Sequence, residues 1–261
     1  MSVSHYLLKV PHVLLFFAIT TLFAGLSVLG TMLFKKYSHL RVHRTHSEVV
    51  GEVFSTVGGL YGLLLGFVVF LVWDSADQAQ SNANREGSLA RGLYRDIRYH
   101  PDTATMAPLR AVYLAYVRHV VYREYPLLES GQPLTKYDRR TFNDVFRQLE
   151  RLDARDPLIE QMFRHLNELA TYRGLRQLNA TSEIPGILWL PLLAGALLTI
   201  VFVTLLKIDS LRLHLLVSGL LGAFLGMTIY IIVLLDHPFA GEIKIEPEEY
   251  RLILTMDEEG D

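Results

Sequence analysis

The sequence contains no cysteine, and its net charge is small. The first absence excludes disulfide bonds, thiolate metal sites and cysteine nucleophiles. The 25 Lys and Arg residues nearly balance the 27 Asp and Glu residues, which leaves a net charge of -2. Such a chain has no general attraction to the phosphates of nucleic acids, so we expect no nucleic-acid partner.

Sequence patterns of common catalytic sites are also missing. The chain has no G-x-S-x-G, H-E-x-x-H, P-loop or dinucleotide-binding fingerprint, so we predict neither an enzyme nor a cofactor. His39, His43 and His46 have the i, i+4, i+7 spacing of a metal-binding helix face. The neighbouring Arg41 and Arg44 would repel a cation there, so we predict no metal site.

Charged residues are absent from four long apolar segments, at residues 13–34, 53–73, 184–206 and 215–235. A helix needs about 20 apolar residues to cross a bilayer, and the mean hydropathy of the whole chain is +0.26. We therefore predict an all-α integral membrane protein in a lipid bilayer, with four transmembrane helices in two pairs. A basic loop, residues 35–52, joins the first pair, and residues 207–214 join the second.

A polar stretch of about 110 residues, 74–183, separates the pairs, and a tail, 236–261, follows the last span. Apolar residues within the stretch recur at helical spacing, which predicts a helical extramembrane insert. One helix is expected to end at Pro126. Another has Asp156 as N-cap, Pro157 at its first position, and a stripe of Leu158, Met162, Leu166 and Leu169. Only "GEIKIE", 241–246, alternates like a strand.

The positive charges lie mainly in the two short loops. Lys35, Lys36, Arg41 and Arg44 belong to the first loop, and Lys207 and Arg212 to the second. The positive-inside rule places both short loops in the cytoplasm. We therefore expect the insert and both termini on the outer side of a membrane, most simply a bacterial inner membrane.

Glycines follow one face of each of two predicted spans, although each costs a helix roughly 1 kcal/mol relative to alanine. Inside a membrane, small residues let helices approach closely. The stripes predict helix-packing faces, within a subunit or between subunits: Gly58, Gly62 and Gly66 in the second span, and Ser218, Gly222 and Gly226 in the fourth.

The opposite face of the second span is bulky and is left for lipid or a pore. Its large side chains include Leu60, Leu64, Phe67 and Leu71.

Residues 46–96 and 235–250 together resemble the bestrophin-like membrane family, long catalogued as a domain of unknown function. The first match pairs a glycine-rich second span with a Glu-containing helix, and the second is a Pro-Phe-x-Gly-like closing motif. The matching residues are Gly58, Tyr61, Phe67, Trp73, Glu86, Ala90, Leu93 and Tyr94, then Pro238, Phe239 and Gly241. The order of pair, insert, pair and tail extends the resemblance over nearly the whole chain.

The resemblance implies kinship to bestrophins, which are pentameric anion channels with four spans per subunit. It implies a pore lined by the second span, with Leu60, Leu64, Phe67 and Leu71 as the narrow neck. Two features depart from that family. Bestrophins keep both termini and the insert in the cytoplasm, and their calcium clasp has no clear counterpart here.

Other charged and proline residues leave alternatives open. Asp74 and Asp77 are either a solvated helix start or a ring at a pore mouth that would favour cations. The group Asp236, His237, Glu246, Glu248 and Glu249 lacks the spacing of a known calcium loop. Pro185 and Pro191 either break the third span or, for Pro185, only start it.

The sequence thus predicts an oligomeric, bestrophin-like ion channel with inorganic anions as cargo. The alternative is a non-conducting membrane scaffold or sensor whose insert binds a partner or a signal.

Overall fold

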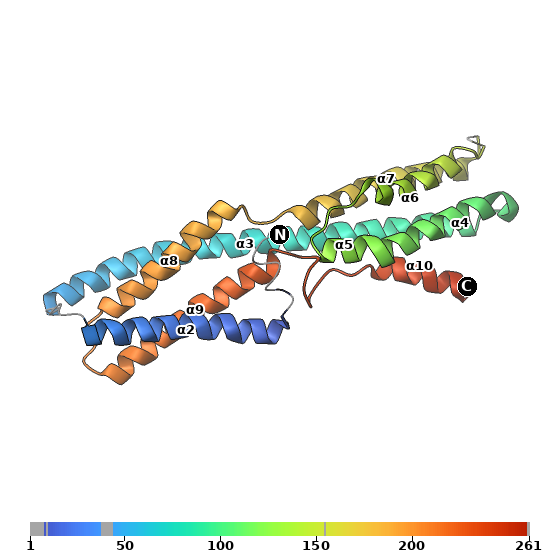
Figure 1. Ribbon diagram of the computed structural model, residues 1–261. Helices are drawn as coiled ribbons and strands as arrows, with labels where there is room; N and C mark the ends of the chain where they lie inside the picture. The colour runs from blue at the N-terminus through green and yellow to red at the C-terminus, as the bar shows by residue number, and fades with distance from the viewer. Residues whose placement is uncertain (1–7, 9, 38–43, 154, 260–261) are drawn as a thin grey trace. The chain divides into compact units, whose positions relative to one another are not determined.

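The protein is described by a computed structural model that covers residues 8, 10–37, 44–153 and 155–259, with side chains at 44–47 left out (Figure 1). Every regular element in this part of the chain is helical. The elements are α2 (His12–Tyr37), α3 (Arg44–Arg98), α4 (Thr103–His119), the π-helix η1 (Val120–Glu124), α5 (Tyr125–Glu129), α6 (Lys136–Leu149), α7 (Pro157–Thr181), α8 (Gly186–Leu205), α9 (Leu211–Leu235) and α10 (Glu248–Glu258).

The chain divides into two compact units. The first, which we call the apolar unit, comprises residues 2–74 and 183–236. The second, the polar unit, comprises residues 75–182 and 237–261. Helix α3 contributes its first part to the apolar unit and its remainder to the polar unit.

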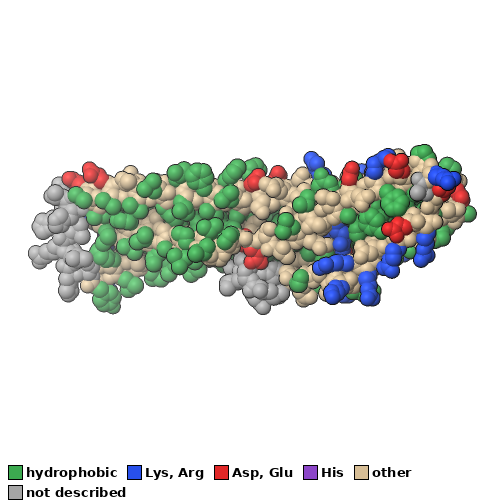
Figure 2. Space-filling view, turned by 90° about the horizontal axis from the view of Figure 1, so that it is seen from above, with side chains coloured by type: hydrophobic (Ala, Val, Ile, Leu, Met, Phe, Trp, Pro, Cys, Tyr) green, Lys and Arg blue, Asp and Glu red, His purple; other side chains and the backbone are tan. Residues whose placement is uncertain are grey.

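Four helices are long and apolar enough to cross a membrane: α2, α3 from Glu48, α8 and α9. Figure 2 shows hydrophobic side chains covering the face of the apolar unit, whereas most of the Lys and Arg side chains in that view gather over the polar unit. Helices that expose side chains of this kind are stable only in lipid or against other protein. The prediction of an all-helical membrane protein with four candidate spans is confirmed.

Helices α2 and α9 form a close pair in the apolar unit. A Cβ atom added to Gly222 would lie 2.5 Å from the carbonyl oxygen of Phe23, so only glycine fits at this crossing. Beside it, the hydroxyl of Thr31 donates a hydrogen bond to the Ser218 hydroxyl over 2.9 Å. Close backbone approach together with a buried hydroxyl pair is the usual way in which helices associate in lipid.

The polar unit has its own hydrophobic core, formed by α3 from Ser75 onward and by α4 to α7 and α10. Its helix starts follow capping rules. The Asp156 side chain accepts a hydrogen bond from the N–H of Leu158, and Pro157 occupies the first helical position, as predicted. Thr135 and Asp138 form a reciprocal capping box at the start of α6.

Two details of the predicted secondary structure are wrong. Pro126 does not end a helix, because it lies in the first turn of α5, where its missing N–H costs nothing. The buried stripe of α7 begins at Ile159, whereas Leu158 is 41% exposed. The alternating residues 241–246 form no strand, as the all-helical prediction implies, since Gly241 turns the chain at a φ of 87° and no strand lies beside them in the described part of the chain.

Pro185 and Pro191 do not split the third span. Pro185 is the N-cap of α8, and Pro191 is the sixth residue of the helix, where it removes one backbone hydrogen bond without ending the helix. The alternative in which Pro185 only starts the helix therefore holds.

Candidate functional site

The bulky face of α3 points away from the other helices of the apolar unit. Leu60, Phe67 and Leu71 are 65%, 61% and 58% exposed, and Leu64 is 38% exposed. We call these four residues the neck face. The buried side of the same segment consists of Tyr61, Leu65, Val68 and Val72. The protomer thus leaves four large apolar side chains without a protein neighbour to cover them fully.

The glycines of α3 are also left uncovered. A Cβ atom added to Gly62 or Gly66 would meet nothing within 4 Å, and one at Gly58 would meet only Phe54 of the same helix, at 3.9 Å. Within the described part of one protomer, this stripe therefore packs against no other helix. Packing within the subunit is therefore not what this stripe does.

The glycines of α9 lie differently, because they face α2. A Cβ atom at Gly222 or Gly226 would come within 3.0 Å of backbone atoms of α2. Ser218 is fully buried beside them. This stripe packs within the subunit.

One close contact of α3 in the apolar unit involves a glycine that the sequence did not single out. The Tyr61 hydroxyl donates a hydrogen bond to the carbonyl oxygen of Leu192 over 2.6 Å. The ring of Tyr61 lies over Gly195, where any Cβ atom would overlap it. Tyr61 therefore fixes α3 against α8 and sets which side of α3 is turned outward.

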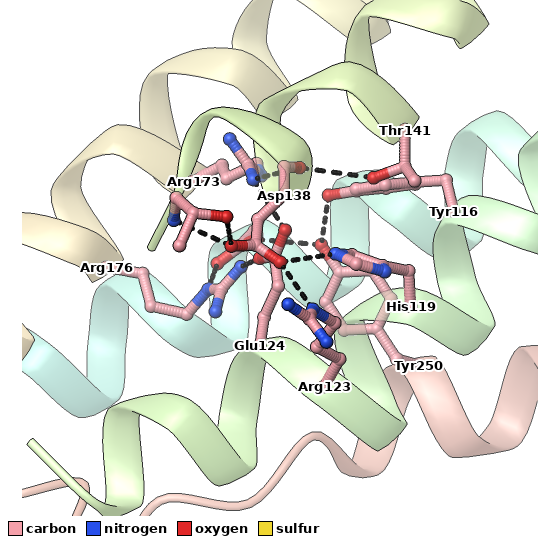
Figure 3. Close-up of polar contacts among 11 residues, drawn as sticks. Tyr116, His119, Arg123, Glu124, Asp138, Thr141, Arg173, Arg176 and Tyr250 are labelled. Carbon is pink, nitrogen blue, oxygen red and sulfur yellow. Dashed lines mark hydrogen bonds and ion pairs between the residues drawn. The ribbon is translucent and has the colours of Figure 1, made fainter. Parts of the chain in front are cut away.

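The polar unit contains a fully buried network of charges (Figure 3). The guanidinium of Arg176 donates to Glu86 over 2.7 Å and to Glu124 over 2.6 Å, and all three side chains have no exposed surface. Arg173 also donates to Glu124, and the Tyr250 hydroxyl donates to Glu86 over 2.8 Å. The network joins α3, η1, α7 and α10.

The carboxylates of this network keep the buried arginine charged. Burial alone would lower the pKa of Arg176, but the carboxylates of Glu86 and Glu124 raise it well above its ordinary value. The guanidinium also lies 4.8 Å from the ring centre of Tyr125, a favourable cation–π distance. Two arginines facing two carboxylates leave no net charge, so the network is suited to holding helices together rather than to binding a free ion.

Asp138 extends this polar layer toward the surface. Its carboxylate accepts hydrogen bonds from the Thr135 backbone and hydroxyl, from Arg123 and, at 3.0 Å, from His119. Burial alone would raise the pKa of Asp138, but these donors, led by the Thr135 hydroxyl, lower it. The carboxylate stays ionised and fixes the start of α6 against α4.

Sequence reasoning missed Arg173 and Arg176 because arginines usually lie in solvent. A signal was nevertheless present. Met162, Leu166 and Leu169 form the buried stripe of α7, and Arg173 and Arg176 continue it at the same spacing of three and four residues. Charged residues at core positions of a helix predict buried partners.

The family-motif residues lie in structural roles. Glu86 is in the buried network, and the Tyr94 hydroxyl donates to Asp257 over 3.0 Å. Phe239 is buried against Tyr125. The Pro238 carbonyl accepts a hydrogen bond from the N–H of Ile245, and Gly241 turns the chain between Pro238 and Ile245. Trp73 is 57% exposed.

The acidic and histidine groups do not assemble a metal site in the part of the chain with described side chains. Asp236 accepts a hydrogen bond from the N–H of Ile184 over 2.7 Å and so links the ends of two spans. His39 and His43, and the side chain of His46, lie outside the described residues. Asp77 is exposed near the start of the polar part of α3, and Asp74 is exposed just before it.

Comparisons with known proteins agree on one family. The model of the bestrophin-like domain matches residues 21–250. A crystal structure of a single-residue variant of a bacterial bestrophin homolog from Klebsiella pneumoniae is 16% identical and has a TM-score of 0.67, over 95% of this chain and 99% of that one. Another structure of the same homolog, solved by Zn-SAD phasing, is 16% identical with a TM-score of 0.66 over the same shares.

No curated protein sequence matches the chain. At 16% identity, the two structures establish a shared fold, and the domain match covers most of the sequence. The chain therefore belongs to the bestrophin-like family.

Proposed function

We propose that the protein is one subunit of an oligomeric ion channel that conducts anions through a pore lined by α3. The observation that carries this proposal is the neck face, a row of large apolar side chains exposed on the uncharged segment 53–73 of α3. Membership of the bestrophin-like family supports it. The same membership also supports a channel-type role rather than an enzymatic one.

An apolar constriction suits the control of ion flow. Water leaves a sufficiently narrow apolar passage, and ions cannot cross it until it widens or wets. Phe67 and its neighbours on the neck face project from a single helix. A ring of such helices would bring the same side chains together around an axis.

The pore requires several subunits, because four helices of one chain cannot enclose an aqueous passage of this kind. We propose a homo-oligomer, a pentamer by analogy with bestrophins. The uncovered glycine stripe at Gly58, Gly62 and Gly66 supports close contact between subunits.

We propose that the protein lies in a bacterial inner membrane with both short loops in the cytoplasm. Lys35 donates to the carbonyl of Ile208 over 3.1 Å, so the basic last turn of α2, with Lys35 and Lys36, lies beside the second loop. The positive-inside rule favours the cytoplasm for this end of the apolar unit. Because the chain has no cysteine, Leu40→Cys and Gln132→Cys can each be labelled in sealed cells. We expect an impermeant reagent to reach only Gln132→Cys. Labelling of Leu40→Cys instead would establish the reverse arrangement, which the resemblance to bestrophins implies.

The alternative is a non-conducting scaffold or sensor. The polar unit has its own core and a buried charge network. A module that binds a partner needs the same features, so they agree with this role. Under this alternative, a well-folded oligomer in liposomes would pass no ions.

Chloride flux from liposomes tests the channel directly. The wild-type protein should release chloride, and Phe67→Ala should raise the rate because it widens the neck. Phe17→Ala on α2 is the matched control, since Phe17 is 59% exposed but lies outside the neck face. Tight vesicles around a folded wild-type oligomer would contradict the channel and leave the scaffold.

A further inference from the structure

The neck face continues along α3 beyond the apolar residues. This helix is unbroken from Arg44 to Arg98, so one side of it recurs about every 3.6 residues. Residues on the same side of the helix as the neck face follow Leu71 at intervals of three, four or seven positions. They include Asp74, Gln78 and Arg85, and we call this row the line of the neck face. All three of these polar residues are exposed.

Arg85 is held in place by a neutral partner. Its guanidinium donates a hydrogen bond to the Tyr172 hydroxyl of α7 over 3.2 Å. The same guanidinium lies 6.0 Å from the centre of the Tyr172 ring. These contacts restrict the side chain but leave its positive charge, and no carboxylate forms an ion pair with it among the described residues.

The other arginines in the polar part of α3 differ from Arg85. Arg91 pairs with Glu249 at 3.2 Å, and Arg95 lies 3.9 Å from Asp96. Arg98 donates to the carbonyl of Met256 and to the Tyr94 hydroxyl. At 100° per residue, Arg91 and Arg95 also fall well away from the line of the neck face.

We infer that Arg85 is a selectivity-determining residue, whose charge concentrates small inorganic anions beside the ion path. The inference rests on the proposed channel function and adds to it the residue that favours anions over cations. In a ring of subunits the charge would repeat once per subunit, and fixed charge of one sign raises the local concentration of ions of the other sign. Asp74, eleven residues or about 16 Å earlier along the helix, opposes this effect.

Reversal potentials in a KCl gradient test the inference on the purified full chain in planar bilayers. Arg85→Gln should lower the chloride-to-potassium permeability ratio at least about threefold, and Arg85→Lys should keep it near the wild-type value. Asp74→Asn should move the ratio in the opposite direction. Arg95→Gln is the matched control, because Arg95 is a 66% exposed arginine of the same helix off this line.

The outcomes separate the two proposals. A conducting wild type whose ratio is the same in Arg85→Gln and Arg95→Gln would overturn the role of Arg85 and leave the channel standing. A folded wild type that passes no ions would overturn the channel, and the role of Arg85 with it. Because a charge effect weakens with screening, the Arg85→Gln difference should shrink at high salt. A difference that salt does not change would contradict an electrostatic role.

Discussion

At the scale of single residues, Arg176 shows how buried charges hold the helices of the polar unit in one arrangement. The side chain is fully buried, yet it contacts carboxylates from two different helices. Buried ion pairs gain little over apolar packing, but removing one member leaves an uncompensated charge in the core. The network therefore specifies which helices meet more than it adds to stability.

Replacement of Arg176 by methionine should destabilise the polar unit by about 3–5 kcal/mol, because Glu86 and Glu124 would lose their shared cation. Denaturant unfolding followed by circular dichroism measures the change. Arg164→Met is the control. Arg164 pairs with Glu160 on the exposed side of α7, and a loss of at most about 0.5 kcal/mol is expected there. Equal losses in both variants would contradict a structural network.

Asp236 should make stability depend on pH. Burial raises its pKa to about 6, partly offset by the N–H of Ile184, and Glu183 adds to the rise. Between pH about 4 and 6 the folded state binds a proton that the unfolded state has released, so stability falls as pH rises through this window.

Asp236→Asn should remove that pH dependence. A shift from 3.8 to about 6 corresponds to at most about 3 kcal/mol at neutral pH. Melting temperatures of wild type and variant in detergent between pH 4 and 8 provide the test. The variant should gain relative to the wild type as pH rises. Parallel curves for the two proteins would show that Asp236 does not titrate in this range.

The residue scale is where the sequence predicted least. Glu86 and Tyr94 were identified by resemblance to a family, but their partners were not, because those partners lie on helices far along the chain. Gly195 belongs to no glycine stripe, so its spacing in the sequence did not identify it. It is nevertheless the residue that leaves room for the ring of Tyr61. Pairwise contacts of this kind depend on how the helices fold back on one another, which local patterns do not contain.

At the scale of helices, length and polarity were sufficient to predict four candidate spans. Each of the four uncharged segments corresponds to one helix, and α3 runs on past the second segment because no proline interrupts it before Pro101. The turn around Pro126 was not predictable in the same way. There the chain passes from α4 through a π-helical turn into α5, and Pro126 fits at the start of that new helix.

Close packing of α2 and α9 should make Gly222 intolerant of any side chain. Gly222→Ala should destabilise the protein by about 1–3 kcal/mol, because its Cβ would meet the backbone of α2. Gly25→Ala on α2 has open space and should be neutral or slightly stabilising. Thermal unfolding in detergent compares the two. If both alanine variants melted alike, the crossing would not be glycine-dependent.

At the scale of the whole molecule, the protomer leaves most of the apolar part of α3 uncovered, including the neck face and the glycine stripe. We propose that other subunits cover the stripe. Gly62→Leu with Gly66→Leu should then abolish oligomers in size-exclusion chromatography with light scattering, without strain within the protomer. Gly25→Leu, also at an open position, should leave the oligomer intact. An unchanged oligomer in the double variant would exclude the stripe as the interface.

The central claim is that the neck face of α3 borders water rather than lipid, and the cysteine-free sequence allows a direct test. In single-cysteine variants, a charged thiol reagent should modify Leu71→Cys and block the chloride current. It should not modify Leu197→Cys on α8, although Leu197 is 62% exposed against 58% for Leu71. Modification of Leu197→Cys at an equal or faster rate, with no effect of the Leu71→Cys reaction on current, would contradict the account.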